Sequence, residues 1–175
     1  MPNQTEHRDW KWWLRTIVIG RSPRRTAMRI VVLIVIVAVS WRYVIRPIRV
    51  EGPSMLPTAK ESQVKFLYRL AYLFHEPRRG DVVAIRFTGE SILLMKRIVG
   101  MPGEKVEFVE GRLHINGQPR TEPYIKRPYT WNFVPDNSQL GPDEYYVVGD
   151  NRTMPEENHT KGIARRTKIV GRVLL

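Results

Sequence analysis

The first candidate for chemistry is a single serine in a stiff turn. Residues 52–58 read Gly-Pro-Ser-Met-Leu-Pro-Thr, so a glycine and two prolines surround Ser54. Glycine permits backbone conformations that other residues resist, and proline restricts its own φ angle. Such a turn can hold a hydroxyl as nucleophile and direct the amide of the same residue at an oxyanion. Because many ordinary loops contain a serine beside proline and glycine, this pattern alone does not establish catalysis.

A serine nucleophile needs a base, and Lys96 is the better candidate. The chain has no cysteine, and its four histidines lack the surroundings of a catalytic triad. Residues 91–99 read SILLMKRIV, and strand alternation sets Lys96 in a row of otherwise apolar side chains (Ile92, Leu94 and Ile98). Burial lowers the pKa of a lysine because the charged form loses its hydration, and a neutral amine can take a proton from serine. The alternative is a lysine at a sheet edge whose ammonium group reaches water.

Short β-type runs separated by turn residues must position these two side chains. After residue 47 we expect strands at 81–87, 91–99, 104–110, 112–115, 144–148 and 167–175. Asn116-Gly117 is a good hairpin signal, and Gly89 and Gly111 mark two further reversals. Residues 118–143 are rich in Pro, Asn and Thr and indicate an extended excursion. The sequence therefore predicts a mainly β domain.

One apolar run precedes this domain. Residues 30–39 (IVVLIVIVAV) carry no polar side chain. A helix needs roughly 20 residues to span about 30 Å of hydrocarbon, so a membrane span must extend over about 27–45. The extension includes Arg29 and Arg42, whose long side chains can reach the interface from near the helix ends. The alternatives are a buried strand and a cleaved secretory signal, but no small-residue cleavage site follows the run.

Charge predicts the orientation of this anchor. The chain has a net charge of +12, and residues 1–45 hold 8 Lys/Arg against 2 Asp/Glu. Basic residues beside an apolar run favour retention of that end in the cytoplasm. We therefore predict a basic cytoplasmic segment at 1–26, a transmembrane anchor at 27–45 and an extracytoplasmic catalytic domain at 46–175. No nucleic-acid partner is expected because no binding motif accompanies the charge, and the sequence contains no metal or nucleotide motif.

Five ordered motifs resemble the sequence boxes of bacterial type I signal peptidases. They are VEGPSMLPT (50–58), RGDVV (79–83), MKRIVGMPGE (95–104), GRLHING (111–117, followed by EPYI at 122–125) and YVVGDNR (146–152). The resemblance runs from about residue 28 to the C-terminus. It implies a β-rich, signal-peptidase-like catalytic domain behind one N-terminal transmembrane helix, in a single-pass protein of the bacterial plasma membrane. The implied activity is a serine endopeptidase that needs no cofactor, uses a Ser/Lys dyad, contacts the lipid bilayer and removes signal peptides from exported preproteins.

The resemblance also implies roles for individual residues. Ser54 matches the nucleophile and Lys96 the general base. The backbone amides of Ser54 and Gly52 are expected in the oxyanion hole, because glycine stands where some members carry a serine donor. An extended signal peptide is expected to add as a strand beside segments 50–54 and 91–96. The expected substrate-binding residues are Pro53, Met55, Leu94 and Met95, and the expected supporting residues are Asp150, Asn151, Arg152 and Glu157.

One segment departs from the family pattern. Residues 155–159 read Pro-Glu-Glu-Asn-His, where the family usually has Ser-x-Asp-Ser-Arg. Pro155 has no hydroxyl with which to hydrogen-bond the lysine, Glu157 can replace the aspartate, and His159 replaces the arginine. An alternative is therefore a catalytically weak or silent relative that binds preproteins or assembles in a membrane complex. A self-cleaving repressor-type Ser/Lys peptidase shares the chemistry, but that class needs a DNA-binding domain or cleavable arm where this chain has an apolar anchor.

Overall fold

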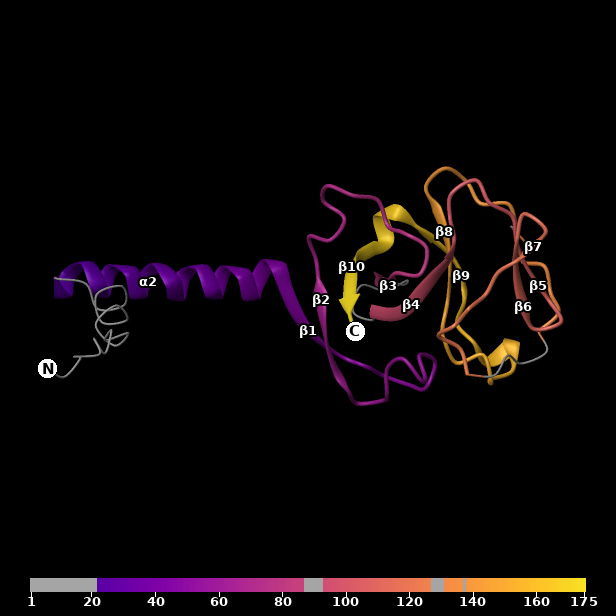
Figure 1. Ribbon diagram of the computed structural model, residues 1–175, viewed down its shortest axis with the longest axis horizontal. Coiled ribbons are helices and arrows are strands. Elements are labelled where there is room, and N and C mark those ends of the chain that lie inside the picture. The colour runs from indigo at the N-terminus through magenta and orange to yellow at the C-terminus, as the bar shows by residue number, and fades with distance from the viewer. Residues whose placement is uncertain (1–21, 87–92, 127–130, 137) are drawn as a thin grey trace, which may run out of the picture. The chain divides into compact units, whose positions relative to one another are not determined.

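The computed structural model describes residues 22–86, 93–126, 131–136 and 138–175, and the reversal predicted at Gly89 lies outside them. The chain divides into two units, Met1–Tyr43 and Val44–Leu175. The first contains the helix α2 (Pro23–Val39), and the second contains the β-strands (Figure 1). A mainly β fold with one N-terminal apolar helix is thereby confirmed.

From Ile30 to Val39, the helix α2 is apolar on all sides. Between Met28 and Val39, its large apolar side chains are 49–69% exposed. A helix that is apolar all round needs a hydrocarbon or protein environment to cover it. Together with the π-helical turn η1 (Ser40–Val44), it makes Arg24–Val44 long and apolar enough to cross a membrane. The anchor predicted at 27–45 overlaps this stretch, and its boundaries stay a prediction.

The strands of the second unit form two antiparallel sheets within the described residues. The larger sheet has seven strands in the order β1-β2-β10-β3-β4-β8-β9, and the smaller has three in the order β5-β6-β7. Two short 3₁₀ helices, η2 (Glu156–Asn158) and η3 (Arg166–Lys168), flank β9. The strands are β1 (Ile45–Arg49), β2 (Val64–Tyr68), β3 (Val82–Arg86), β4 (Leu93–Gly100), β5 (Val106–Val109), β6 (Arg112–Ile115), β7 (Gln118–Pro119), β8 (Glu144–Val148), β9 (Gly162–Arg165) and β10 (Ile169–Leu174).

Each of the six predicted strands overlaps an observed one, and β4 runs one residue beyond its predicted end. The hairpin predicted at Asn116-Gly117 joins β6 to β7, and both turn residues have the positive φ angles (53° and 75°) that a tight two-residue turn requires. Four short strands, β1, β2, β7 and β9, were not predicted. The sequence of β1, Ile-Arg-Pro-Ile-Arg, does not have the pattern of a strand. β1 is an edge strand, and it tolerates Pro47 because the missing N–H is not needed for pairing on its open side.

Three buried clusters hold the sheets and their loops together. One joins the small sheet to β8 through Phe108, Trp131 and Tyr146, and Figure 1 shows β5, β6 and β7 on the far side of β8 from β1. Another lies among β3, β4, β8, β9 and β10. The remaining cluster packs Met55, which is 1% exposed, against residues of β2, β3 and β10. Because Met55 follows Ser54 directly, this cluster anchors the predicted nucleophile turn to the large sheet.

Candidate active site

The turn that carries Ser54 is fixed on both sides. Gly52 has a φ angle of +74°, a left-handed conformation that only glycine adopts without strain. Two residues after Ser54, the amide of Leu56 donates a hydrogen bond of 3.0 Å to the carbonyl of Pro53. The buried side chain of Met55 adds an apolar anchor. Ser54 itself is half-buried, so its hydroxyl is held in place without being covered.

Lys96 lies on β4 and directs its amine at Ser54. It is 3% exposed and pairs across the strands with Val83, which is fully buried. The distance from Lys96 Nζ to Ser54 Oγ is 2.9 Å, although the two residues are 42 positions apart in the chain. Burial lowers the pKa of Lys96 from 10.5 to about 8, and the charge of Asp150 acts in the opposite direction. A small but useful fraction of this amine is neutral near pH 7 and can accept a proton from the hydroxyl.

The predicted oxyanion donors are the backbone amides of Gly52 and Ser54. In the part of the chain that the structure describes, neither amide donates a hydrogen bond to a backbone or side-chain acceptor. An oxyanion hole requires such available N–H groups next to the nucleophile. The geometry suits the predicted role, which stays a prediction.

An open cleft of about 380 Å³ borders the Ser54 hydroxyl. Its lining consists of residues 46–51, Ser54, Met55, Ala84 and residues 93–96. On β4, residues 93–96 pair with β3 only, because β8 joins β4 from Arg97 onwards. β1 pairs with β2 alone among the described strands. Both β1 and the first half of β4, which contribute to the lining, therefore have an unpaired edge that can accept an extended peptide.

Three of the four predicted substrate-binding residues line this cleft. They are Met55, Leu94 and Met95, whereas Pro53 is not part of its lining. Sequence reasoning missed the contribution of β1, because that strand was not predicted. The cleft also has two arginines, Arg46 and Arg49, and one carboxylate, Glu51, on the β1 side.

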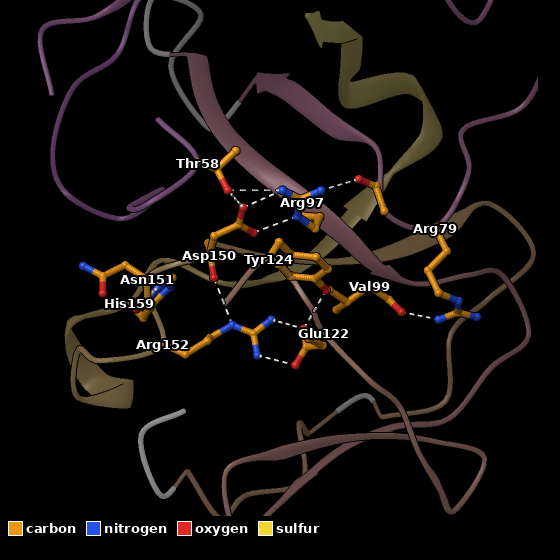
Figure 2. A network of polar contacts seen from close by, with 12 residues as sticks. Thr58, Arg79, Arg97, Val99, Glu122, Tyr124, Asp150, Asn151, Arg152 and His159 are labelled. Atoms are coloured by element: carbon orange, nitrogen blue, oxygen red, sulfur yellow. Dashed lines mark hydrogen bonds and ion pairs between the residues drawn. The ribbon is translucent and has the colours of Figure 1, made fainter. Parts of the chain in front are cut away.

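Asp150 connects β4 to the nucleophile turn (Figure 2). Arg97, the residue after Lys96, donates to both carboxylate oxygens of Asp150 at 2.8 and 2.5 Å, and the two side chains are 8% and 0% exposed. Thr58, at the end of the turn, donates its hydroxyl to the same carboxylate. A buried bidentate pair of this kind fixes geometry as well as charge. Sequence reasoning found Asp150 but missed Arg97 and Thr58, although both lie inside quoted motifs.

A second buried ion pair lies beside the first. Arg152 contacts both carboxylate oxygens of Glu122 at 3.0 and 2.6 Å. Tyr124 donates its hydroxyl to Glu122 at 2.7 Å, and its ring lies 4.0 Å from the guanidinium of Arg97. Burial, followed by the Glu122 carboxylate, raises the pKa of Tyr124, so this hydroxyl stays protonated and remains a donor. Glu122 and Tyr124 belong to the EPYI motif at 122–125, for which sequence alone predicted no role.

Asn151 contacts the backbone on both sides of the Ser54 peptide unit. Its amide N–H donates to the Ser54 carbonyl at 3.0 Å, and its side-chain Nδ2 donates to the Pro53 carbonyl at 3.1 Å. His159 lies next to Asn151, as Figure 2 shows, with Nε2 3.2 Å from the Asn151 carbonyl. The predicted supporting residues Asp150, Asn151 and Arg152 are thus brought to the dyad or its neighbours.

Glu157, the fourth predicted supporting residue, is not brought to this group. It is exposed on η2 and has no hydrogen bond or ion pair within the described residues. Its neighbour Glu156 instead pairs with Lys161 at 2.7 Å. The same described residues hold no group of three or more His, Asp or Glu side chains that could bind a metal ion.

Known proteins resemble this chain over most of its length. Residues 24–175 match the family described as signal peptidase, peptidase S26. The chain is 32% identical over 163 residues to a signal peptidase I of Leptolyngbya laminosa, covering 88% of this chain and 79% of the relative. It is 30% identical over 153 residues to signal peptidase I T of Bacillus subtilis strain 168, covering 81% and 78%. A crystal structure of a signal peptidase I from Enterococcus faecalis V583 aligns with a TM-score of 0.48 and 25% identity, over 57% of this chain and 97% of that one.

Proposed function

The chain belongs to the signal peptidase family, peptidase S26, and on that premise we propose that it is a membrane-bound serine endopeptidase whose dyad is Ser54 and Lys96. Its substrates are the signal peptides of exported preproteins. The observation that carries this proposal is the 2.9 Å contact between a buried lysine amine and a serine hydroxyl at the border of an open cleft. A positioned base beside a hydroxyl is the arrangement that activates a serine nucleophile.

The reaction follows from these positions. Neutral Lys96 takes the proton of Ser54 as Oγ attacks the scissile carbonyl carbon, and the amides of Ser54 and Gly52 stabilise the negative oxygen. The protonated Lys96 then gives this proton to the leaving amine, which is the new N-terminus of the mature protein. A water molecule next hydrolyses the acyl-enzyme, with Lys96 again taking and returning a proton. Lys96 is therefore neutral again at the end of acylation and at the end of deacylation.

The unpaired strand edges at the cleft support an extended substrate. A signal peptide that adds between residues 46–51 and 93–96 extends the sheet and places alternate side chains against Met55, Leu94 and Met95. Export signals carry small residues at positions −1 and −3. We expect efficient cleavage with Ala at −1 and poor cleavage with Phe at the same position.

The helix α2 supports a single membrane span for this peptidase. Arg24, Arg25 and Arg29 lie at its N-terminal end, so residues 1–26 remain cytoplasmic and the domain from residue 46 onwards is extracytoplasmic in this proposal. Protease added to intact spheroplasts should then digest the catalytic domain. Full protection of that domain, with digestion only after permeabilisation, contradicts the orientation.

One observation favours a second candidate, a silent relative that binds preproteins without cleaving them. Within the described residues, Ser54 Oγ is the single hydrogen-bond partner of Lys96 Nζ, and Pro155 offers no hydroxyl to orient the amine. The deciding experiment compares the full-length wild type with Ser54→Ala in detergent, using a model preprotein. The control Ser138→Ala changes a serine outside the cleft lining. Cleavage by wild type and Ser138→Ala but not by Ser54→Ala supports the peptidase, whereas binding without cleavage by all three supports the silent relative.

A further inference from the structure

His159 occupies a buried position that the proposed reaction does not use. It is 5% exposed and follows η2 directly. Its ring stands edge-on to Trp131, with the ring centroids 5.1 Å apart. Trp131 is in turn held by a hydrogen bond of 2.9 Å from its Nε1 to the Met154 carbonyl. The imidazole is therefore fixed by packing and has little freedom to move.

The hydrogen bond of His159 defines which nitrogen carries the proton. Nε2 lies 3.2 Å from the carbonyl oxygen of Asn151. A carbonyl oxygen only accepts hydrogen bonds, so Nε2 must be protonated and must donate. The neutral ring with its proton on Nε2 is sufficient for this contact.

This contact continues directly to the nucleophile. Asn151 receives the hydrogen bond of His159 on its carbonyl and donates from its own amide to the carbonyl of Ser54. An added Cβ on Gly149 would lie 2.2 Å from the Ser54 oxygen and 2.5 Å from Cε1 of His159. The turn at Gly149–Asn151 is therefore in tight contact with the histidine on one side and the Ser54 peptide unit on the other.

We propose that His159 is a positioning residue for the dyad, which holds the Gly149–Asn151 turn against the Ser54 carbonyl and thereby fixes the Ser54 hydroxyl and amide. This inference rests on the proposed function. A shift of the turn moves the Ser54 peptide unit relative to Lys96, and small misplacements of a nucleophile strongly reduce the rate of the chemical step. His159 is not in the lining of the cleft, so its loss affects turnover rather than substrate binding.

The ring acts as a neutral group throughout the working pH range. Burial, together with the charges of Lys96 on β4 and Arg152 in the adjoining turn, lowers its pKa from 6.5 to about 4. The hydrogen bond to the backbone of Asn151 opposes this effect. Because His159 does not titrate where Lys96 does, it leaves the pH dependence of cleavage to the lysine.

Two substitutions separate positioning from other roles. The amide nitrogen of His159→Gln can take the place of Nε2 and donate to Asn151, whereas His159→Leu fills the site without a donor. We expect His159→Gln to keep kcat within about threefold of wild type, with an unchanged KM and pH profile. We expect His159→Leu to lower kcat about tenfold, the effect of losing one hydrogen bond of ordinary strength, again with little change in KM. His75→Leu is the control, because His75 is exposed.

A second readout does not depend on cleavage and so separates this inference from the proposed function. In hydrogen–deuterium exchange of the full-length protein, the amides of Asn151 and Leu56 report on the turn and on the Ser54 loop. Both should exchange faster in His159→Leu and at the wild-type rate in His159→Gln, even if no variant cleaves a preprotein. Unchanged exchange and turnover in His159→Leu overturn the proposal. The positioning proposal is also overturned if His159→Gln and His159→Leu lose kcat equally, or if His159→Gln has an altered pH profile. Either result favours proton transfer by the His159 ring.

Discussion

Replacing Lys96 with methionine should stabilise the folded protein below about pH 8. Burial lowers the pKa of this lysine from 10.5 to about 8, a fall of about 2.5 units. At about 1.4 kcal/mol for each pKa unit, a protonated Lys96 costs the folded state about 3 to 4 kcal/mol relative to the unfolded chain. Methionine has a stem of similar length without the charge. Allowing about 1 kcal/mol for the lost hydrogen bond to Ser54, we expect a net gain of about 2 to 3 kcal/mol at pH 6.

The sign of this effect depends on pH in a defined way. Below about pH 8 both the folded and the unfolded chain carry the proton, so the full cost of the buried charge is present. Between about pH 8 and 10.5 the folded state releases its proton while the unfolded chain still holds it, and the cost falls. Wild-type stability should therefore rise towards that of Lys96→Met across this window. The advantage of the variant should be gone near pH 10.5.

Thermal unfolding of the full-length protein in detergent, followed by tryptophan fluorescence, measures the difference. A gain of about 2 to 3 kcal/mol corresponds to a rise in Tm of about 4–12 °C for a protein of this size. Lys60→Met is the matched control, because Lys60 is exposed and its replacement should produce no such pH-dependent gain. If Lys96→Met and wild type have the same Tm at pH 6, the buried charge is not costly. The same conclusion follows if the variant has an equal Tm advantage at pH 6 and at pH 10.

Three further predictions concern activity. In the proposed mechanism Lys96 acts as a neutral amine, so wild-type kcat/KM should rise with pH and level off above about pH 8. Lys96→Arg should be inactive because a guanidinium stays protonated, and turnover by this variant contradicts the Ser/Lys mechanism. Gly149→Ala should lower kcat by about a hundredfold, because the Cβ of the new alanine would lie 2.2 Å from the Ser54 carbonyl oxygen. Near-normal kinetics of this variant would show that the turn can relax. Asp150→Asn should move the acid limb of the pH profile to lower pH, because the Asp150 carboxylate raises the pKa of Lys96. The same variant should have a lower Tm, because Arg97 loses its buried charge partner. An acid limb that moves to higher pH contradicts this electrostatic role.

Several features of this protein could be read from local sequence. The turn at Asn116-Gly117 follows from the ability of these two residues to adopt positive φ angles. The helix α2 follows from a long apolar run with basic residues beside it, and six strands follow from short β-type runs bounded by turn residues. Ser54 and Lys96 were identified by their motifs. In each case the information lies within about ten consecutive residues.

The strands that escaped prediction show where local pattern fails. β1 contains a proline and two arginines, and it is a strand because β2 offers a pairing edge and because the free side of an edge strand needs no N–H at Pro47. β9 is a four-residue strand at the opposite edge of the same sheet. Edge strands depend on a neighbour for their conformation, and the neighbour is distant in sequence. The cleft beside β1 was for the same reason only half predicted.

The partners of the site residues were decided by tertiary structure alone. Thr58 and Asp150 are 92 positions apart, and Glu122 and Arg152 are 30 apart, yet each pair is joined in the fold. Sequence shows that a buried charge needs a partner but not which distant residue supplies it, because strand order and loop paths set that distance. The motifs of this chain therefore determined the identity of the candidate nucleophile and base. Only the packing of β4 against the Ser54 turn determined that the amine is buried, that its pKa is lowered, and that His159 lies behind the turn that holds the serine.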